Sequence, residues 1–250
     1  MLTKIISFSV SVMAIMLTSC TTAYYYPTRQ NVIKFKEKGD ANASLGLDAN
    51  GYATYQAGYA ITDHVALVSD YKTFHTYETS ADGEYTVGDY FWDNEVIAYT
   101  RYQEHIYPAI NVGYGFGQVD RNDTFARIQV YRQYVQPSLG FSNDYLDIAV
   151  STRFTRVNHA VEQLKELTIN PDIPFREQYG LGEVGQRPFY FLEPALTLGV
   201  GAKGFRIRYQ VAVISKTSSG NIKYVDTNQF VSLEGRVNVN RLLTQRSHLE

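Results

Sequence analysis

The chain has 250 residues, a formal net charge of −2 and 19% charged residues. No basic tract stands out, so the composition excludes a nucleic-acid-binding surface from our expectations. The sequence contains one cysteine, which excludes an intramolecular disulfide. Its 21 tyrosines and 13 phenylalanines against one tryptophan suit β-strands or the boundary between apolar and wet surroundings.

The first twenty residues have the pattern of a secretory signal. Lys4 precedes an apolar run from Ile5 to Leu17. This run is shorter than the about 20 residues that a transmembrane helix needs, and serines interrupt it. It ends in Leu17-Thr18-Ser19-Cys20, which resembles the lipobox of bacterial lipoproteins. The resemblance implies export, cleavage before Cys20 and acylation of that cysteine with diacylglycerol and usually a third chain, such as palmitate.

The residue after the cysteine bears on the destination. Thr21 stands where many lipoproteins retained in the inner membrane have an aspartate. By this resemblance, we expect a lipid-anchored protein of the outer membrane of a Gram-negative bacterium. Membrane lipid is then the expected partner, through the Cys20 acyl chains and the exterior of the folded domain, while protein partners stay open.

Beyond the leader, apolar and polar residues alternate with a period of two in ten segments, each bounded by Gly, Asn, Asp or Pro. Asn50-Gly51 supplies a tight hairpin between the first two. The predicted strands are Ala41 to Leu47, Tyr52 to Ile61, Val65 to Phe74, Glu95 to Gln103, Tyr107 to Phe116, Phe125 to Leu139, Tyr145 to Arg156, Phe189 to Val200, Phe205 to Ser215 and Gln229 to Val239.

Short and long connections alternate along these strands. Those at His75 to Asn94, Gly117 to Thr124, Val157 to Pro188 and Lys216 to Asn228 are long, whereas those between them are short. This predicts an all-β fold, a single up-and-down antiparallel β-barrel of about ten strands, with short turns at one end and long loops at the other. An even strand count also puts both termini at the short-turn end. The predicted domains are a signal peptide at 1–19, a lipidated leader at 20–38, the β-barrel at 39–240 and a tail at 241–250.

The polar face of the strands carries charges of both signs, which favours an outward apolar face in lipid over a soluble barrel with the faces exchanged. Charges that meet inside a barrel could pair and so avoid the penalty of unpaired burial. The candidate lumen charge network is Arg101, Arg153, Glu193, Arg206, Arg208, Glu234 and Arg236. The strand from Phe125 fits least, because Arg127 and Arg132 fall on opposite faces and Pro137 lacks a donor.

The longest connection contains one helix signal. Asn158 is a candidate cap, Ala160, Val161, Leu164 and Leu167 follow at helical spacing, and Asn170-Pro171 ends the pattern. We expect one short helix there, either as a lid or packed on the barrel rim. The loop from His75 to Asn94 is acidic and aromatic, which suits either sugar or cation binding or a solvated loop.

The sequence offers little support for a catalytic site. The five histidines show no metal-ligand spacing, and no Gly-x-Ser-x-Gly elbow occurs. We therefore expect no enzyme activity, no metal and no cofactor, and a structural, adhesive or narrow-transport role. Two alternatives stay open: a tethered soluble periplasmic barrel that binds an apolar ligand, and a membrane-barrel enzyme acting on lipids, for which a pair such as His159 with Ser151 could be proposed.

Overall fold

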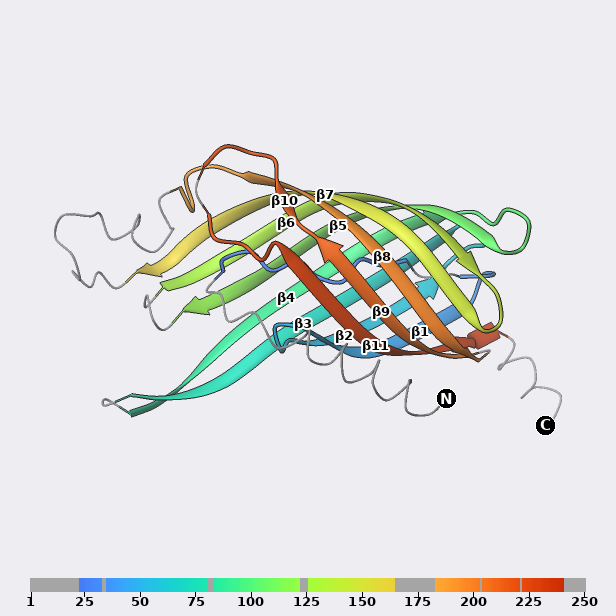
Figure 1. Ribbon diagram of the computed structural model, residues 1–250, viewed down its shortest axis with the longest axis horizontal. Helices are drawn as coiled ribbons and strands as arrows, with labels where there is room; N and C mark the ends of the chain where they lie inside the picture. Colours follow the sequence, from blue (N-terminus) through green and yellow to red (C-terminus); the bar gives the residue numbers. More distant parts are fainter. Residues whose placement is uncertain are drawn as a thin grey trace, which may run out of the picture.

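A computed structural model describes residues 23–32, 35–80, 83–121, 126–164, 183–202, 204–220 and 222–240. Ten antiparallel strands close into one barrel (Figure 1), because consecutive strands pair from β1 to β9 and β11 pairs with both β9 and β1. The two residues of β10 pair with β8 beyond the point where β9 ends. The strands are β1 (Asp40–Asp48), β2 (Ala53–Ala60), β3 (Val65–Ser80), β4 (Gly83–Tyr99), β5 (Ile106–Arg121), β6 (Ala126–Ser142), β7 (Leu146–Leu164), β8 (Phe189–Ala202), β9 (Phe205–Val213), β10 (Ser215–Lys216) and β11 (Thr227–Asn238).

The predicted fold class is confirmed, and each of the ten predicted strands overlaps one strand of the barrel. The two faces of the wall also point as expected. Ile110 and Leu233 face outward with 46% and 47% of their surface exposed, while Arg208 and Glu234 face inward with 6% and 1% exposed. The apolar rows therefore form the exterior and the charged rows the interior.

The connections between consecutive strands alternate between the two ends of the barrel. Strands β2 and β3, β4 and β5, β6 and β7, and β8 and β9 are joined by short turns at one end, which we call the turn end. The β3–β4, β5–β6, β7–β8 and β9–β11 connections and the tight β1–β2 hairpin lie at the opposite end, which we call the loop end. Among the described residues, no helix is long and apolar enough to cross a membrane.

The predicted loop from His75 to Asn94 is instead mostly strand. Strands β3 and β4 pair without interruption from Val65 opposite Ala98 to Ser80 opposite Gly83. Strand β5 pairs with β4 only as far as Tyr90, so the outer part of this hairpin projects alone beyond the wall (Figure 1). A projecting hairpin has no core to face, and the alternation that marks a strand in the sequence is therefore weak there.

The predicted helix is wrong over Asn158 to Leu164, because β7 continues through these residues and pairs with β6 up to Ala126. The inter-strand ladder provides backbone hydrogen bonds that outweigh a weak local helix preference. Val157 and His159 accordingly point inward and are buried. Leu167 and Asn170-Pro171 lie outside the described residues.

Strand β6, the poorest fit in the sequence, is a full member of the wall. Arg132 is buried inside, whereas Arg127 lies outward near the loop end and pairs with Asp120 at 3.1 Å. The pairing with β7 is interrupted beside Pro137, which has no backbone N–H to donate. A register shift between Arg127 and Ile128 accommodates the end of the strand.

Candidate functional site: the filled lumen

The leader, which leads to β1 in the sequence, lies inside the barrel. Every residue from 23 to 32 is buried, with Tyr25 at 0%, Gln30 at 1% and Asn31 at 2% exposure. In Figure 1 this segment, in blue, runs lengthwise within the wall. No position for the leader could be predicted, because its polar run Thr28-Arg29-Gln30-Asn31 shows neither strand nor helix periodicity.

Hydrogen bonds at its two ends fix the direction of the leader. At the loop end, the Tyr24 amide donates to the Lys223 carbonyl at 2.8 Å, and the Val225 amide donates to the Tyr25 carbonyl at 3.2 Å. At the turn end, the Lys36 amide donates to Asp40 at 2.6 Å, and the Lys38 amide donates to Asp63 at 2.7 Å. The chain thus enters the described structure at the loop end and crosses the lumen before β1 begins.

This direction corrects the expectation that both termini lie at the turn end. An even strand count fixes only the start of β1 and the end of β11, which do lie together there, with Asp40 opposite Asn238. Ala23 lies at the loop end, because the leader runs from there through the lumen to the turn end before β1 begins.

The wall binds the leader through its backbone. Eight consecutive leader carbonyls, from Tyr24 to Asn31, face donors that the wall or the adjoining loop supplies. The partners in order are the ring nitrogen Nε2 of His159, the Val225 amide, Arg132, Lys72, Arg153 for both Thr28 and Arg29, Gln210, and finally Asn111 with Gln136. Such pairing is required where an extended chain is buried away from water. The polar inner face of the wall therefore serves as a backbone-binding surface.

At the loop end, the lumen is sealed by apolar packing. Tyr24, Tyr25 and Tyr26 belong to a buried cluster that includes Phe91 and Phe191. The Tyr25 ring stacks on Phe191 with the centroids 4.3 Å apart, and its hydroxyl donates to Glu193. The three tyrosines thus close this end with their rings while the polar tip of Tyr25 reaches the charged interior.

Toward the turn end lies a cluster of arginines around Asp147. This carboxylate pairs with Arg206 at 3.2 Å, Arg208 at 3.0 Å and Arg236 at 3.2 Å. Glu234 completes the cluster by pairing with Arg208 at 2.7 Å and with Arg236. Four residues of the predicted charge network therefore lie together, around an aspartate that the sequence analysis did not include.

The other predicted network residues lie elsewhere. Arg153 is buried at mid-barrel, where it reaches the leader carbonyls and lies 3.5 Å from Glu95. Glu193 is buried nearer the loop end, where it accepts from Thr155 at 2.7 Å. Arg101 is exposed on the turn that follows β4, where it lines the opening at the turn end.

Sequence reasoning missed several buried ion pairs. Lys72 lies 2.6 Å from Asp48, Arg132 lies 2.8 Å from Asp93, and Arg29 of the leader lies 3.6 Å from Asp70. The wall members occupy inward positions of β1, β3, β4 and β6, so a strict two-residue count along those strands could have found them. Nothing in the local sequence signals the role of Arg29.

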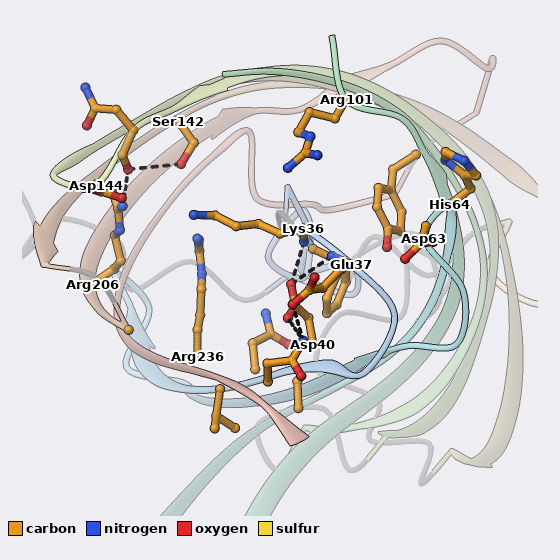
Figure 2. A pocket seen from close by; sticks show the side chains of 18 of the residues that line it. Lys36, Glu37, Asp40, Asp63, His64, Arg101, Ser142, Asp144, Arg206 and Arg236 are labelled. Carbon is orange, nitrogen blue, oxygen red and sulfur yellow. Dashed lines mark hydrogen bonds between the residues drawn. The ribbon is translucent and has the colours of Figure 1, made fainter. Parts of the chain in front are cut away.

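A cavity of about 810 Å³ opens at the turn end (Figure 2). Its lining carries both signs of charge, with Lys36, Arg101, Arg206 and Arg236 against Glu37, Asp40, Asp63 and Asp144. Deeper in the barrel, two cavities beside the leader measure about 10 Å³ each, which is about the room that one water molecule needs. The leader thus fills the lumen between the tyrosine cluster and the turn-end cavity.

The candidate catalytic pair is not assembled. His159 and Ser151 both point inward from β7, but eight residues separate them along one strand, or about 26 Å. Ser151 donates to Gln30 at 2.7 Å, whereas His159 contacts the Tyr24 carbonyl. Both side chains hold the leader. Cys20 lies outside the described residues.

No family of known proteins and no curated protein matches the chain. Similar solved structures include the N-terminal β-barrel domain of Pseudomonas aeruginosa OprF, at 8% identity and a TM-score of 0.34, covering 80% of this chain and 99% of that one. The outer membrane enzyme PagL is 9% identical with a TM-score of 0.32, covering 80% and 99%. Outer membrane phospholipase A from Escherichia coli is 12% identical with a TM-score of 0.31, covering 83% and 93%.

Proposed function

We propose that this protein is a closed outer-membrane β-barrel, anchored in addition by acylated Cys20, whose role is structural or adhesive. The observation that carries the proposal is the pairing of an apolar exterior with a charged interior. The long loops at the loop end would then face the outside of the cell and the short turns the periplasm.

The exterior has the composition and height that a bilayer requires. The outward residues of β8 are Tyr190, Leu192, Pro194, Leu196, Leu198 and Val200. At about 3.3 Å per residue and a tilt of about 40°, this row spans about 25 Å of the membrane normal, which matches the apolar band of outer-membrane barrels. In water, such a surface would be an exposed apolar patch that favours aggregation.

Aromatic side chains form a continuous outward row on neighbouring strands toward the loop end. Tyr55, Tyr71, Trp92, Phe116 and Tyr131 are paired in register across β2, β3, β4, β5 and β6. Tyr55 and Tyr71 have ring centroids 6.3 Å apart, and Trp92 and Phe116 have theirs 5.8 Å apart. A row of this kind is typical of a girdle at the level of the lipid headgroups.

The filled lumen argues for a structural or adhesive role over conduction. A solute would have to displace the leader together with its ion pairs and backbone hydrogen bonds. An apolar ligand, which the tethered soluble alternative requires, would meet charged side chains inside. The separation of His159 from Ser151 removes the pair on which the lipid-enzyme alternative depended.

The proposal is tested by separating the two anchors. The Cys20→Ala variant lacks the acylation site but keeps the barrel, so it should still partition with the outer membrane and migrate faster on a gel when unheated than when boiled. A double variant with Val112→Asp and Leu198→Asp places charge in the apolar band, and in the Cys20→Ala background it should leave the membrane fraction. Release of Cys20→Ala alone into the soluble fraction would contradict the membrane-embedded barrel.

A further inference from the structure

The direction of the leader determines on which side of the barrel its N-terminal continuation emerges. Ala23 and Tyr24 lie at the loop end, beside Val225 and His159 on the β7 and β8 side of the rim. Both the start of β1 and the end of β11 lie at the opposite end. The sequence upstream of Ala23 therefore starts on the side of the long loops.

The distance to Cys20 is short compared with the barrel. Cys20 lies three positions before Ala23 in the sequence, and three extended residues reach at most about 11 Å. The apolar band is about 25 Å tall. A chain of that length cannot return across the band to the turn end.

The return path through the lumen is also filled. Residues 23 to 32 are buried along it, and the spaces beside them measure about 10 Å³ each. A second extended chain, or an acyl chain, would need the leader to leave. The backbone hydrogen bonds from Tyr24 to Asn31 and the ion pair of Arg29 with Asp70 oppose that movement.

We propose that the acylated Cys20 lies at the loop end, so that its acyl chains insert into the outer leaflet and the lipidated terminus is displayed on the cell surface. This inference rests on the proposed function, because it requires a membrane-crossing barrel and an acylated Cys20. It places the lipid at the opposite end of the barrel from the turn end, where the even strand count put both termini. The leader then acts as a strap through the barrel that joins a lipid on one face of the membrane to β1 on the other.

Single free cysteines test this arrangement in the full chain, since acylation consumes the Cys20 thiol. Thr22→Cys probes the leader, Ser219→Cys serves as the loop-end reference and Asp144→Cys as the turn-end reference. Intact cells are treated with a membrane-impermeant maleimide, then treated again after the outer membrane is permeabilised. We expect Thr22→Cys and Ser219→Cys to be labelled in intact cells and Asp144→Cys only after permeabilisation.

The outcomes distinguish a failure of this inference from a failure of the proposed function. Labelling of Thr22→Cys only after permeabilisation, together with Asp144→Cys, would overturn the surface position of the lipid and leave the barrel intact. Equal labelling of Ser219→Cys and Asp144→Cys in intact cells would overturn the membrane-crossing barrel itself. Failure of Cys20 to incorporate a clickable fatty acid, with Cys20→Ala as the control, would overturn the acylation.

A second readout does not depend on the reactivity of a thiol near the packed rim. A short epitope inserted between Thr21 and Thr22 should be detected by antibody on intact cells, as should the same epitope inserted after Ser219. The epitope inserted after Asp144 should be detected only in permeabilised cells. Detection of the leader epitope only in permeabilised cells would contradict the inference.

Discussion

The two ends of the lumen are built differently, although one leader runs through both. At the loop end, three tyrosines pack into an apolar cluster with Phe91 and Phe191, and the chain is sealed from solvent. At the turn end, the leader is held by carboxylates, at Asp40 and Asp63, beside an open cavity lined by charges of both signs. Apolar packing therefore closes one end of the lumen, whereas hydrogen bonds and solvated charges hold the leader at the other.

Between the two ends, the interior combines many buried charges with one extended peptide. Burying a charge is costly unless it is paired, and one buried pair is weak evidence for stability by itself. The charges of this lumen serve a second purpose, because Lys72, Arg132 and Arg153 donate to leader carbonyls as well as pairing with acids. The network therefore makes the leader a part of the folded barrel.

The largest effect is expected from removing the leader. Deletion of residues 23–36 leaves its wall donors without acceptors and Asp70 without Arg29, and each unsatisfied buried group costs about 1–3 kcal/mol. We expect loss of the compact, fast-migrating form on unheated gels. Deletion of 241–250, which follow the last strand in the sequence, is the control and should preserve that form. Normal migration of the leader deletion would show that the wall is stable when empty.

The second largest effect is expected from breaking a buried ion pair. Asp93→Ala leaves the buried guanidinium of Arg132 without its carboxylate, and we expect the free energy of unfolding to fall by about 3–5 kcal/mol. Equilibrium unfolding in urea, with the barrel in lipid vesicles, measures the change. If Asp93→Ala were as stable as the unmodified protein, the pair would contribute nothing to the hold on the leader.

Removal of the Tyr25 hydroxyl should lower the free energy of unfolding by less. Tyr25→Phe keeps the ring on Phe191 but removes the hydroxyl that donates to Glu193, and we expect a loss of about 1–2 kcal/mol. Tyr190→Phe removes a hydroxyl from the outward face of β8 and is the control, with little expected change. Equal values for the two variants would mean that the ring alone secures the loop end.

The smallest effect is expected from a substitution at the open turn end. Asp144 is exposed at the rim of the turn-end cavity, and we expect Asp144→Ala to change the free energy of unfolding by less than about 0.5 kcal/mol. The same urea titration compares it with Asp93→Ala. A loss as large as that of Asp93→Ala would contradict the difference drawn between the sealed interior and the solvated end.

The strands of the wall could be predicted from the amino-acid pattern. Alternation with a period of two marked ten strands and separated an apolar face from a charged one, since a side chain's direction in a strand follows from its position alone. It failed where no core imposes that alternation, as in the outer β3–β4 hairpin, and where a local helix preference at Asn158 to Leu164 met the ladder with β6.

What fills the barrel, by contrast, follows only from the folded structure. The leader has no periodic pattern, and its partners lie far away in the sequence, as Gln30 with Gln210 and Arg29 with Asp70 show. The wall binds the leader through backbone carbonyls, which every residue carries, as well as through side chains such as Thr28 and Asn31. Neither kind of contact leaves a periodic pattern in the sequence of the leader. Closure of the sheet brings the donors of many strands around one line, and that geometry exists only once the barrel has formed.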